Sequence, residues 1–334
     1  MPLSFLLTDD LIQDLANLNN QFADKFAILK NCNIEELDAL HKYARVSTIG
    51  ASTRIENALL TDIEVNWIDT ILTIDGKLSA FNRNRTLIKN KLSKDRERSI
   101  EEVAGCRAML LLIYANPSDF FPLKENDLRA LHYELMSPYK KAIPYAGKYK
   151  IQSNSVIEKN KFTNEERVIF KTADPGPITS AAMHDLIKWY NNSMFFSPWS
   201  IAITAELVYR FLAIHPFQDG NGRLGRAMFL MSLLHSTSNV ISFVSKYIAI
   251  DRCIEKHKEE YYYVLNRCSD GAFKEDPKKY KIQYFLRFMI KVLQESIEDI
   301  ELYRNRFKAE RLLSTTALSI LNCFKDNPAI RLTT

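Results

Sequence analysis

Residues 215–226 read His-Pro-Phe-Gln-Asp-Gly-Asn-Gly-Arg-Leu-Gly-Arg, a polar and glycine-rich run in an otherwise apolar part of the chain. Apolar residues recur at helical spacing on both sides of it, at Ile201, Ala205, Val208 and Leu212 before it and at Leu224, Met228 and Met231 after it. We therefore predict that the run is a loop between two buried helices. A loop held by two packed helices is a rigid support for a functional site.

The composition of this loop predicts an anion site. Gly220 and Gly222 let the backbone approach a ligand, and free N–H groups at the start of a helix attract anions together with the helix dipole. Asn221 adds an amide, which we expect to line the same site. Arg223 and Arg226 supply guanidinium groups, whose planar forks suit phosphate oxygens. These residues favour nucleotide-phosphate binding over the alternative of a surface turn capped by charged residues.

Two further residues of the loop predict chemistry beyond binding. An imidazole with a pKa near neutrality removes the proton of a hydroxyl nucleophile, so His215 is the candidate base. Asp219 is the candidate ligand of Mg²⁺, which takes one or two carboxylates together with phosphate oxygens. Phe217 is expected to anchor the loop in the core. The other five histidines stand in no comparable group of residues and are interpreted as structural, namely His41, His132, His184, His235 and His257.

The loop resembles the signature of the Fic family, His-x-Phe-x-(Asp/Glu)-Gly-Asn-Gly-Arg-x-x-Arg, and matches it at every fixed position. The resemblance, which extends to bacterial protein adenylyltransferases, implies a Fic-type helical bundle. It implies transfer of part of a nucleotide, most often AMP from ATP, to a hydroxyl side chain of a target protein. His215 would be the base, Asp219 would hold Mg²⁺, and Arg223 and Arg226 would pair with the β- and γ-phosphates.

A second stretch resembles the inhibitory helix of Fic proteins that silence themselves. Ser52-Thr53-Arg54-Ile55-Glu56-Asn57 fits (Ser/Thr)-x-x-x-Glu-(Gly/Asn), and we expect a short helix over about 52–62. Ser52 and Glu56 are four residues apart and share one helix face, and Asn57 lies within the family pattern. The resemblance implies that Glu56 pairs with Arg226 and misplaces the phosphates of ATP. The alternative is an ordinary surface glutamate.

Composition predicts a mostly α-helical chain. Only nine glycines occur among long stretches of Leu, Ile, Lys and Glu. We predict a helical N-terminal region over 1–100, a Fic core over 101–297 and a C-terminal helical segment over 298–334. Residues 314–334 resemble the opening of a winged helix-turn-helix. The basic stretch at 77–98 is interpreted as a solvated helix or connection and not as a binding patch.

One small β-hairpin is expected in the core region. Its predicted strands are 147–151 and 167–171, and the breaker at 174–177 ends it. In the resemblance it corresponds to the Fic flap, about 147–175, whose edge strand would pair with an extended target segment. The alternative is a simply exposed hairpin. The resemblance also places an aromatic ring against the nucleotide base within Tyr261–Tyr263, and we take Tyr262 as the candidate.

The overall composition excludes several classes of protein. With 46% apolar and 25% charged residues the 334-residue chain has material for a large core, and a net charge of +5 is too small to indicate nucleic-acid binding by itself. Five cysteines without C-x-x-C spacing indicate neither a disulfide framework nor a zinc site. No apolar run approaches a membrane span, and the first ten residues show no export signal. We expect a cytoplasmic protein without a membrane partner.

The resemblance implies a self-inhibited protein adenylyltransferase that takes ATP and Mg²⁺ and modifies a Ser, Thr or Tyr hydroxyl of a target protein. The chain itself is one candidate target. Transfer of another nucleotide, or removal of AMP by the same site, stays open. A hypothesis of a different class is a nucleotide-sensing, DNA-binding regulator, with the C-terminal segment as the DNA-binding part. A homodimer also stays open.

Overall fold

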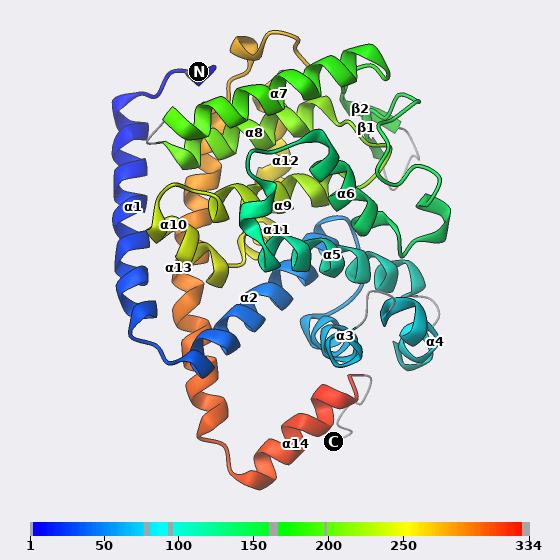
Figure 1. Ribbon diagram of the computed structural model, residues 1–334, viewed down its shortest axis with the longest axis vertical. Helices are drawn as coiled ribbons and strands as arrows, with labels where there is room; N and C mark the ends of the chain where they lie inside the picture. The colour runs from blue at the N-terminus through cyan, green and yellow to red at the C-terminus, as the bar shows by residue number, and fades with distance from the viewer. Residues whose placement is uncertain (1–2, 77–79, 93–95, 160–165, 197–198, 329–334) are drawn as a thin grey trace.

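The computed structural model describes residues 3–76, 80–92, 96–159, 166–196 and 199–328, and these are mostly helical (Figure 1). The first described residues lie near α7, and α14 lies at the opposite end of the molecule. The helices are α1 (Asp9–Lys30), α2 (Ile34–Ile55), α3 (Asp62–Asp75), α4 (Ala80–Leu92), α5 (Glu97–Ala115), α6 (Glu125–Met136), α7 (Pro177–Phe196), α8 (Ser200–Ile214), α9 (Asn221–Leu234), α10 (Asn239–Val244), α11 (Ile250–Lys256), α12 (Lys258–Arg267), α13 (Gln283–Arg311) and α14 (Thr315–Asp326).

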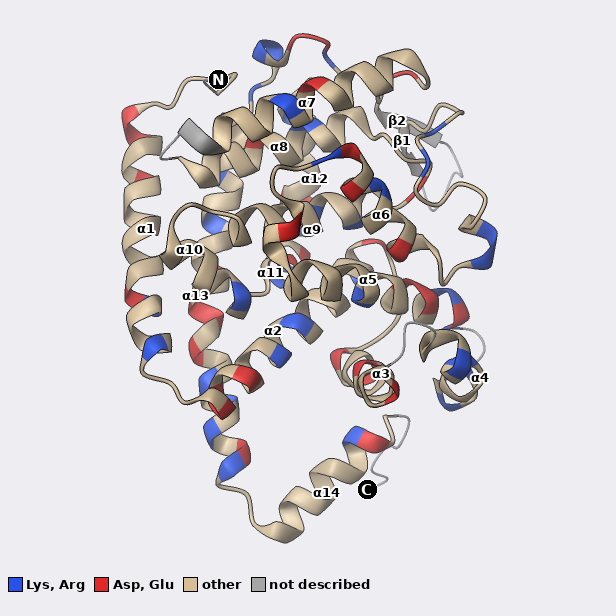
Figure 2. Cartoon of the chain, viewed as in Figure 1, with Lys and Arg blue, Asp and Glu red and all other residues tan. Residues whose placement is uncertain are grey.

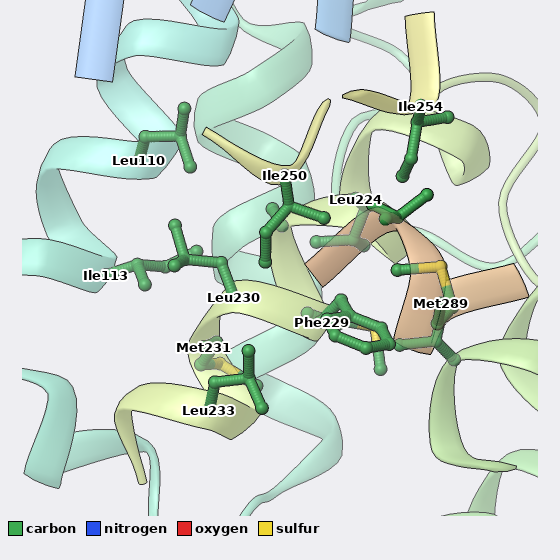
Figure 3. Packing of buried hydrophobic residues seen from close by; sticks show 14 of the residues in the cluster. Leu110, Ile113, Leu224, Phe229, Leu230, Met231, Leu233, Ile250, Ile254 and Met289 are labelled. Atoms are coloured by element: carbon green, nitrogen blue, oxygen red, sulfur yellow. The ribbon is translucent and has the colours of Figure 1, made fainter. Parts of the chain in front are cut away.

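Helices α8 and α9 form the centre of the core, as the apolar periodicity predicts. Every residue of α8 is buried, and so is every residue of α9 except Gly222. Figure 3 shows the apolar side chains of α9 packed against neighbours from α5, α11 and α13, with Leu224 and Phe229 beside Met289 and Ile250. Residues 215–220 join the two helices, so the predicted loop is held at both ends by the most buried part of the molecule.

The segment expected to be a separate helix over 52–62 is arranged differently. Helix α2 runs without a break to Ile55, since nothing between residues 45 and 52 interrupts it. Asn57 then takes a positive φ of 71°, which ends the helix. A new helix, α3, begins after Thr61, whose hydroxyl and backbone form a capping box with Glu64. The predicted inhibitory residues therefore lie in the last turn of α2 and just past its end.

The hairpin exists, but its first strand was placed wrongly by the sequence. The two strands are β1 (Val156–Lys159) and β2 (Glu166–Phe170), paired antiparallel. The run 147–151 instead reaches the active-site loop: Tyr149 forms a β-bridge with Phe217, and the Lys150 amide donates to the Pro216 carbonyl over 2.8 Å. Its alternating pattern suits an extended segment in either arrangement, and the partner is decided by tertiary packing.

The C-terminal helices extend the bundle. Helix α13 packs against α1, α2, α8, α11 and α12, and it continues without interruption through residue 297, where the sequence suggested a boundary. Likewise α5 continues through residue 100. Helix α14 has no buried residue and contacts α3. The resemblance to a winged helix-turn-helix stays a prediction.

The basic stretch around α4 pairs with neighbouring acidic residues. Figure 2 shows basic residues along α4 beside acidic residues of α3 and α5. Arg83 pairs with Asp75 of α3, and Arg85 pairs with Glu101 of α5. These ion pairs agree with the interpretation of a solvated helix. Among the described helices, none combines the length and the apolar character that a membrane span requires.

Candidate active site

One cavity of about 350 Å³ lies over the 215–226 loop, a size typical of ligand pockets. Its polar lining includes His215, Asp219, Gly220, Gly222 and both arginines of the loop. Its apolar lining comes from β2, α8 and α12, namely Phe170, Tyr209, Leu212, Ala213, Tyr261, Tyr262 and Leu265. The cavity therefore combines cationic and other polar groups with an apolar wall.

His215 follows the last residue of α8 in a left-handed conformation, with φ 54° and ψ 58°. Its ring Nδ1 lies 3.2 Å from the carbonyl of Leu212. Because a carbonyl only accepts, Nδ1 carries the proton and Nε2 is left as the acceptor. Burial lowers the pKa of His215 to about 4, and the Lys150 ammonium adds to this effect. The expectation of a pKa near neutrality for His215 is therefore wrong in this structure, in which the imidazole is neutral at pH 7.

The backbone of the loop presents the start of α9 to the cavity. Gly220, with φ 80°, turns the chain into the helix. Gly222 lacks a side chain where one would collide with Glu56 Oε1. Asn221 lines the cavity, and its side-chain amide accepts from the Phe217 N–H at 2.9 Å and donates to the Phe217 carbonyl at 2.7 Å. Asn221 thus closes the loop with its side chain.

Phe217 and His132 support the loop from below. Phe217 is fully buried, as expected of an anchor, and its ring stacks on His132 of α6 with centroids 3.9 Å apart. His132 Nε2 donates to the Asp219 carbonyl at 2.9 Å, and Nδ1 accepts from the Gly147 amide at 2.8 Å. Since Nδ1 must accept, this structural histidine is neutral. Burial lowers its pKa to about 4.

This arrangement predicts acid destabilisation. The folded pKa of His132 lies below the value near 6.5 of an unfolded histidine, so the unfolded chain binds more protons as pH falls. Its stabilising contribution is complete above pH 6.5 and is lost as pH falls toward 4. Between pH 7 and 5 we expect this fully buried residue to reduce the free energy of unfolding by roughly 1–2 kcal/mol.

Urea unfolding at pH 7, 6 and 5 measures this effect in the parent and in His132→Gln. The variant is expected to be less stable at pH 7, because its side chain replaces the stacked ring, but to lose less stability on acidification. Equal acid losses in both proteins would show that His132 does not carry the effect.

Arg226 lies at the centre of a buried charge network that joins α2, α9 and α11. Its Nη2 donates to Glu56 Oε1 at 3.0 Å and to the Ser52 carbonyl at 2.8 Å. Its Nε donates to Asp251 Oδ1 at 2.9 Å and lies 3.3 Å from Ser52 Oγ. Although burial opposes the charged form, Glu56 and Asp251 raise the pKa of Arg226. Glu56 therefore contacts the guanidinium that the sequence assigned to a phosphate.

The sequence missed Asp251. Its side chain is only 3% exposed, and it holds the Nε side of Arg226 while Glu56 holds Nη2. A lone aspartate at the start of a short helix carries no signal in the sequence, because its role depends on α11 packing against α2. Asp251 thus gives Arg226 a second carboxylate partner, which does not depend on the Glu56 contact.

A second arginine fastens the end of α2. Arg54 donates to both carboxylate oxygens of Glu255 on α11, at 2.6 and 2.9 Å, and to Asp62 at 2.8 Å. Three residues after Arg54, the side chain of Asn57 accepts from Lys258 Nζ at 3.1 Å. These bonds on both sides of Glu56 hold its backbone against α11 and α12.

Asp219 lies at the mouth of the cavity with its side chain 43% exposed. Its Oδ1 accepts from the Gly220 amide at 2.6 Å and lies 3.4 Å from Arg223 Nη2, while Oδ2 lies 3.2 Å from Arg98 Nη2 on α5. Arg98 also donates to Glu102 at 2.7 Å. The sequence missed this pair on α5.

The residues present fit Mg²⁺ bound together with phosphate. The described residues contain no cluster of three or more metal-ligating side chains, and Mg²⁺ needs none when phosphate oxygens and water complete its shell. Asp219 supplies one accessible carboxylate beside the start of α9. Arg223 Nε is buried and has no hydrogen-bond acceptor among the described residues, so a donor is left for a phosphate oxygen.

The three tyrosines of α12 face different ways. Tyr261 is 2% exposed, Tyr262 is 39% exposed and Tyr263 is 62% exposed. Only Tyr261 and Tyr262 line the cavity. The candidate Tyr262 therefore lines the cavity with a partly exposed ring, and Leu265 of the same helix also contributes to the cavity wall.

Known proteins resemble the chain in sequence and in fold. Residues 122–233 match the model of the Fic/DOC family. Two curated proteins named "Protein adenylyltransferase Fic", from Aedes aegypti and Culex quinquefasciatus, are each 23% identical to the chain over 232 residues, or 67% of its length. The chain spans 39% of the length of these relatives.

Two solved structures show the same architecture. A Fic family protein from Desulfovibrio desulfuricans superposes with a TM-score of 0.61 at 22% identity, covering 97% of this chain and 82% of that one. A Fic-domain signaling protein from Bacteroides thetaiotaomicron gives a TM-score of 0.60 at 22% identity, with 86% and 97% covered. The chain has the Fic helical fold. Its residues 122–233 match the Fic/DOC family model, so the chain contains a Fic domain.

Proposed function

We propose that this protein transfers AMP from ATP to a hydroxyl side chain of a target protein and that Glu56 inhibits it. The observation that carries the proposal is the cavity in which a neutral imidazole acceptor, the start of α9 and two buried arginines face one enclosed space. The names of the two curated relatives support the same activity.

In this mechanism His215 Nε2 accepts the proton of the target hydroxyl as its oxygen attacks the α-phosphorus of ATP. The bond from that phosphorus to the bridging oxygen breaks, and pyrophosphate leaves. The N–H groups at the start of α9, with Arg223 and Arg226, bind and orient the phosphates. Asp219 would hold Mg²⁺, whose charge would neutralise that of the phosphates. Because positioning provides most of the rate in phosphoryl-transfer sites, small displacements of these groups are costly.

The hairpin is the proposed docking element for the target. Phe170 of β2 lines the cavity, and the next residue, Lys171, is fixed by backbone bonds to residues 271–273. A target segment in extended form would add to the hairpin and bring its hydroxyl to His215.

Intact-protein mass spectrometry tests the reaction. The protein and its Glu56→Gly variant are incubated with Mg²⁺ and, in separate samples, ATP, GTP, CTP or UTP. We expect an AMP adduct with ATP, larger in the variant. An adduct only with another nucleotide would revise the substrate, and loss of AMP from a pre-modified sample would indicate the removal reaction. No adduct and no removal in either protein would contradict the proposal.

Asp219→Ala is expected to lower Mg²⁺-dependent transfer by about 10- to 100-fold, because one coordinating carboxylate and its bond to the Gly220 amide are lost together. Raising the Mg²⁺ concentration should recover part of the loss. Titration of the initial rate against Mg²⁺ in the Glu56→Gly background measures this. Activity that is indifferent to a chelator in the parent would contradict the metal assignment.

A further inference from the structure

A buried lysine bonds the backbone of the residue that precedes the candidate base. Lys150 is 3% exposed, and its Nζ donates to Asn154 Oδ1 at 2.8 Å, to Thr172 Oγ1 at 2.9 Å and to the carbonyl of Ile214 at 3.1 Å. No described carboxylate lies within ion-pair distance of this ammonium group. A buried charge that is bonded only to neutral acceptors is costly, so its retention requires a reason.

The acceptor on Ile214 is informative because Ile214 is the last residue of α8 and precedes His215. The last carbonyls of a helix lack intrahelical donors and carry the negative end of the helix dipole. An ammonium group at this position satisfies one such carbonyl and is itself stabilised by the dipole. Lys150 therefore caps α8 at the point where the chain turns left-handed into His215.

The neighbours of Lys150 extend this support across the loop. Asn154 Nδ2 donates to the Phe217 carbonyl at 2.6 Å and lies 3.4 Å from the carbonyl of His215. The Lys150 amide donates to the Pro216 carbonyl at 2.8 Å. Together these bonds engage four consecutive carbonyls, from residues 214 to 217, so the backbone that carries the His215 ring is fixed from one side.

We propose that Lys150 is a positioning residue for the His215 base, which fixes the end of α8 and sets the charge around the imidazole. The role of His215 as base rests on the proposed transfer function, whereas the coupling of Lys150 to His215 is a property of the folded protein. Lys150 acts through His215 and does not line the cavity itself.

Three charged groups act on the His215 ring from three parts of the chain. Lys150 lowers its pKa from the segment before the hairpin, while Glu56 at the end of α2 and Asp219 in the loop raise it. Burial lowers the pKa of Lys150 itself to about 8, so its charge is present throughout the acidic range in which His215 titrates. Removing that charge therefore raises the pKa of His215.

The experiment follows the imidazole of His215 by carbon-13 NMR against pH in the parent, with His215→Ala used to assign the signal. Lys150→Met is expected to raise the pKa of His215 by roughly one unit. Lys150→Gln, which retains a donor without the charge, is expected to do the same. Lys148→Met removes an exposed lysine two residues away and should leave the titration unchanged.

The parent itself gives a test that needs no substitution. As pH rises through about 8, Lys150 loses its proton, and the His215 signal should show a second and smaller inflection there. Absence of that inflection, or an unchanged His215 titration in the folded Lys150 variants, would overturn the inference even where a variant fails to fold.

Activity separates this inference from the proposed function. In the Glu56→Gly background, Lys150→Met should shift the acid limb of kcat/KM upward with the imidazole titration and lower kcat several-fold while the KM for ATP stays the same. If no variant transfers AMP, the proposed function fails and the NMR test still decides the role of Lys150. If transfer occurs with an unshifted acid limb, the inference fails and the function stands.

Discussion

His215→Ala is expected to reduce AMP transfer by at least 100- to 10,000-fold, the range that general-base catalysis contributes. The ring supplies the only described imidazole in the cavity, and its Nε2 is the free acceptor. ATP binding should survive, because the ring meets the incoming hydroxyl and not the phosphates. Adduct formation measured by mass spectrometry in the Glu56→Gly background, together with calorimetric ATP binding, separates these effects.

His184→Ala is the matched control, since it removes an imidazole whose side chain is 70% exposed on α7 outside the cavity. It should retain the full transfer rate. Transfer at the parental rate by His215→Ala would show that another group removes the proton. Loss of both transfer and ATP binding would instead place the ring in nucleotide binding.

The parts of the site that sequence predicts well are those whose function is local. The 215–226 loop brings its glycines and cations together within a single turn, so their joint role follows from spacing alone. The periodicity of Ile201–Leu212 also predicts helix α8 with one buried face, although the structure buries every residue of that helix. In both cases the neighbours in space are neighbours along the chain.

The features of the site that the sequence did not predict depend on contacts between residues far apart in the chain. Asp251 contacts Arg226 only because α11 packs on α2. Lys150 bonds the Ile214 carbonyl only because its segment pairs with the 215–220 loop and not with the hairpin. The prediction of a hairpin strand at 147–151 was wrong for the same reason, because the sequence of an extended segment does not determine which segment it pairs with. Arg98 meets Asp219 across 121 residues of sequence.

Glu56 lies where the proposed inhibition and the proposed phosphate site would overlap. Its carboxylate bonds Arg226 and also lies where a side chain at residue 222 would stand, over the first turn of α9. A carboxylate is favoured there by the same N–H groups and dipole that would bind a phosphate. Under the proposed function, Glu56 would therefore compete with the phosphates both for Arg226 and for the first turn of α9.

Glu56→Gly is therefore expected to increase transfer and self-modification by about ten- to a hundredfold. A charge-assisted hydrogen-bonded pair contributes roughly 1.5–3 kcal/mol, and each ~1.4 kcal/mol corresponds to tenfold in rate or equilibrium. The full gain requires that the blocked state dominates in the parent. Asp251 keeps Arg226 oriented in the variant, so the freed Nη2 is available to the γ-phosphate. Initial rates of AMP incorporation with both proteins measure the gain.

The controls for this prediction separate charge removal from loss of the clamp. Glu259→Gln removes a negative charge from the exposed surface of α12 and should leave the rate unchanged. Arg226→Ala should be inactive, because it removes both the partner of Glu56 and the guanidinium that would bind the γ-phosphate. The double variant Arg226→Ala/Glu56→Gly should be as inactive as Arg226→Ala alone. If Glu56→Gly leaves the rate unchanged while His215→Ala abolishes it, the proposed transfer activity is supported and the proposed inhibition by Glu56 is wrong. The Glu56–Arg226 bond is then a structural ion pair at the end of α2.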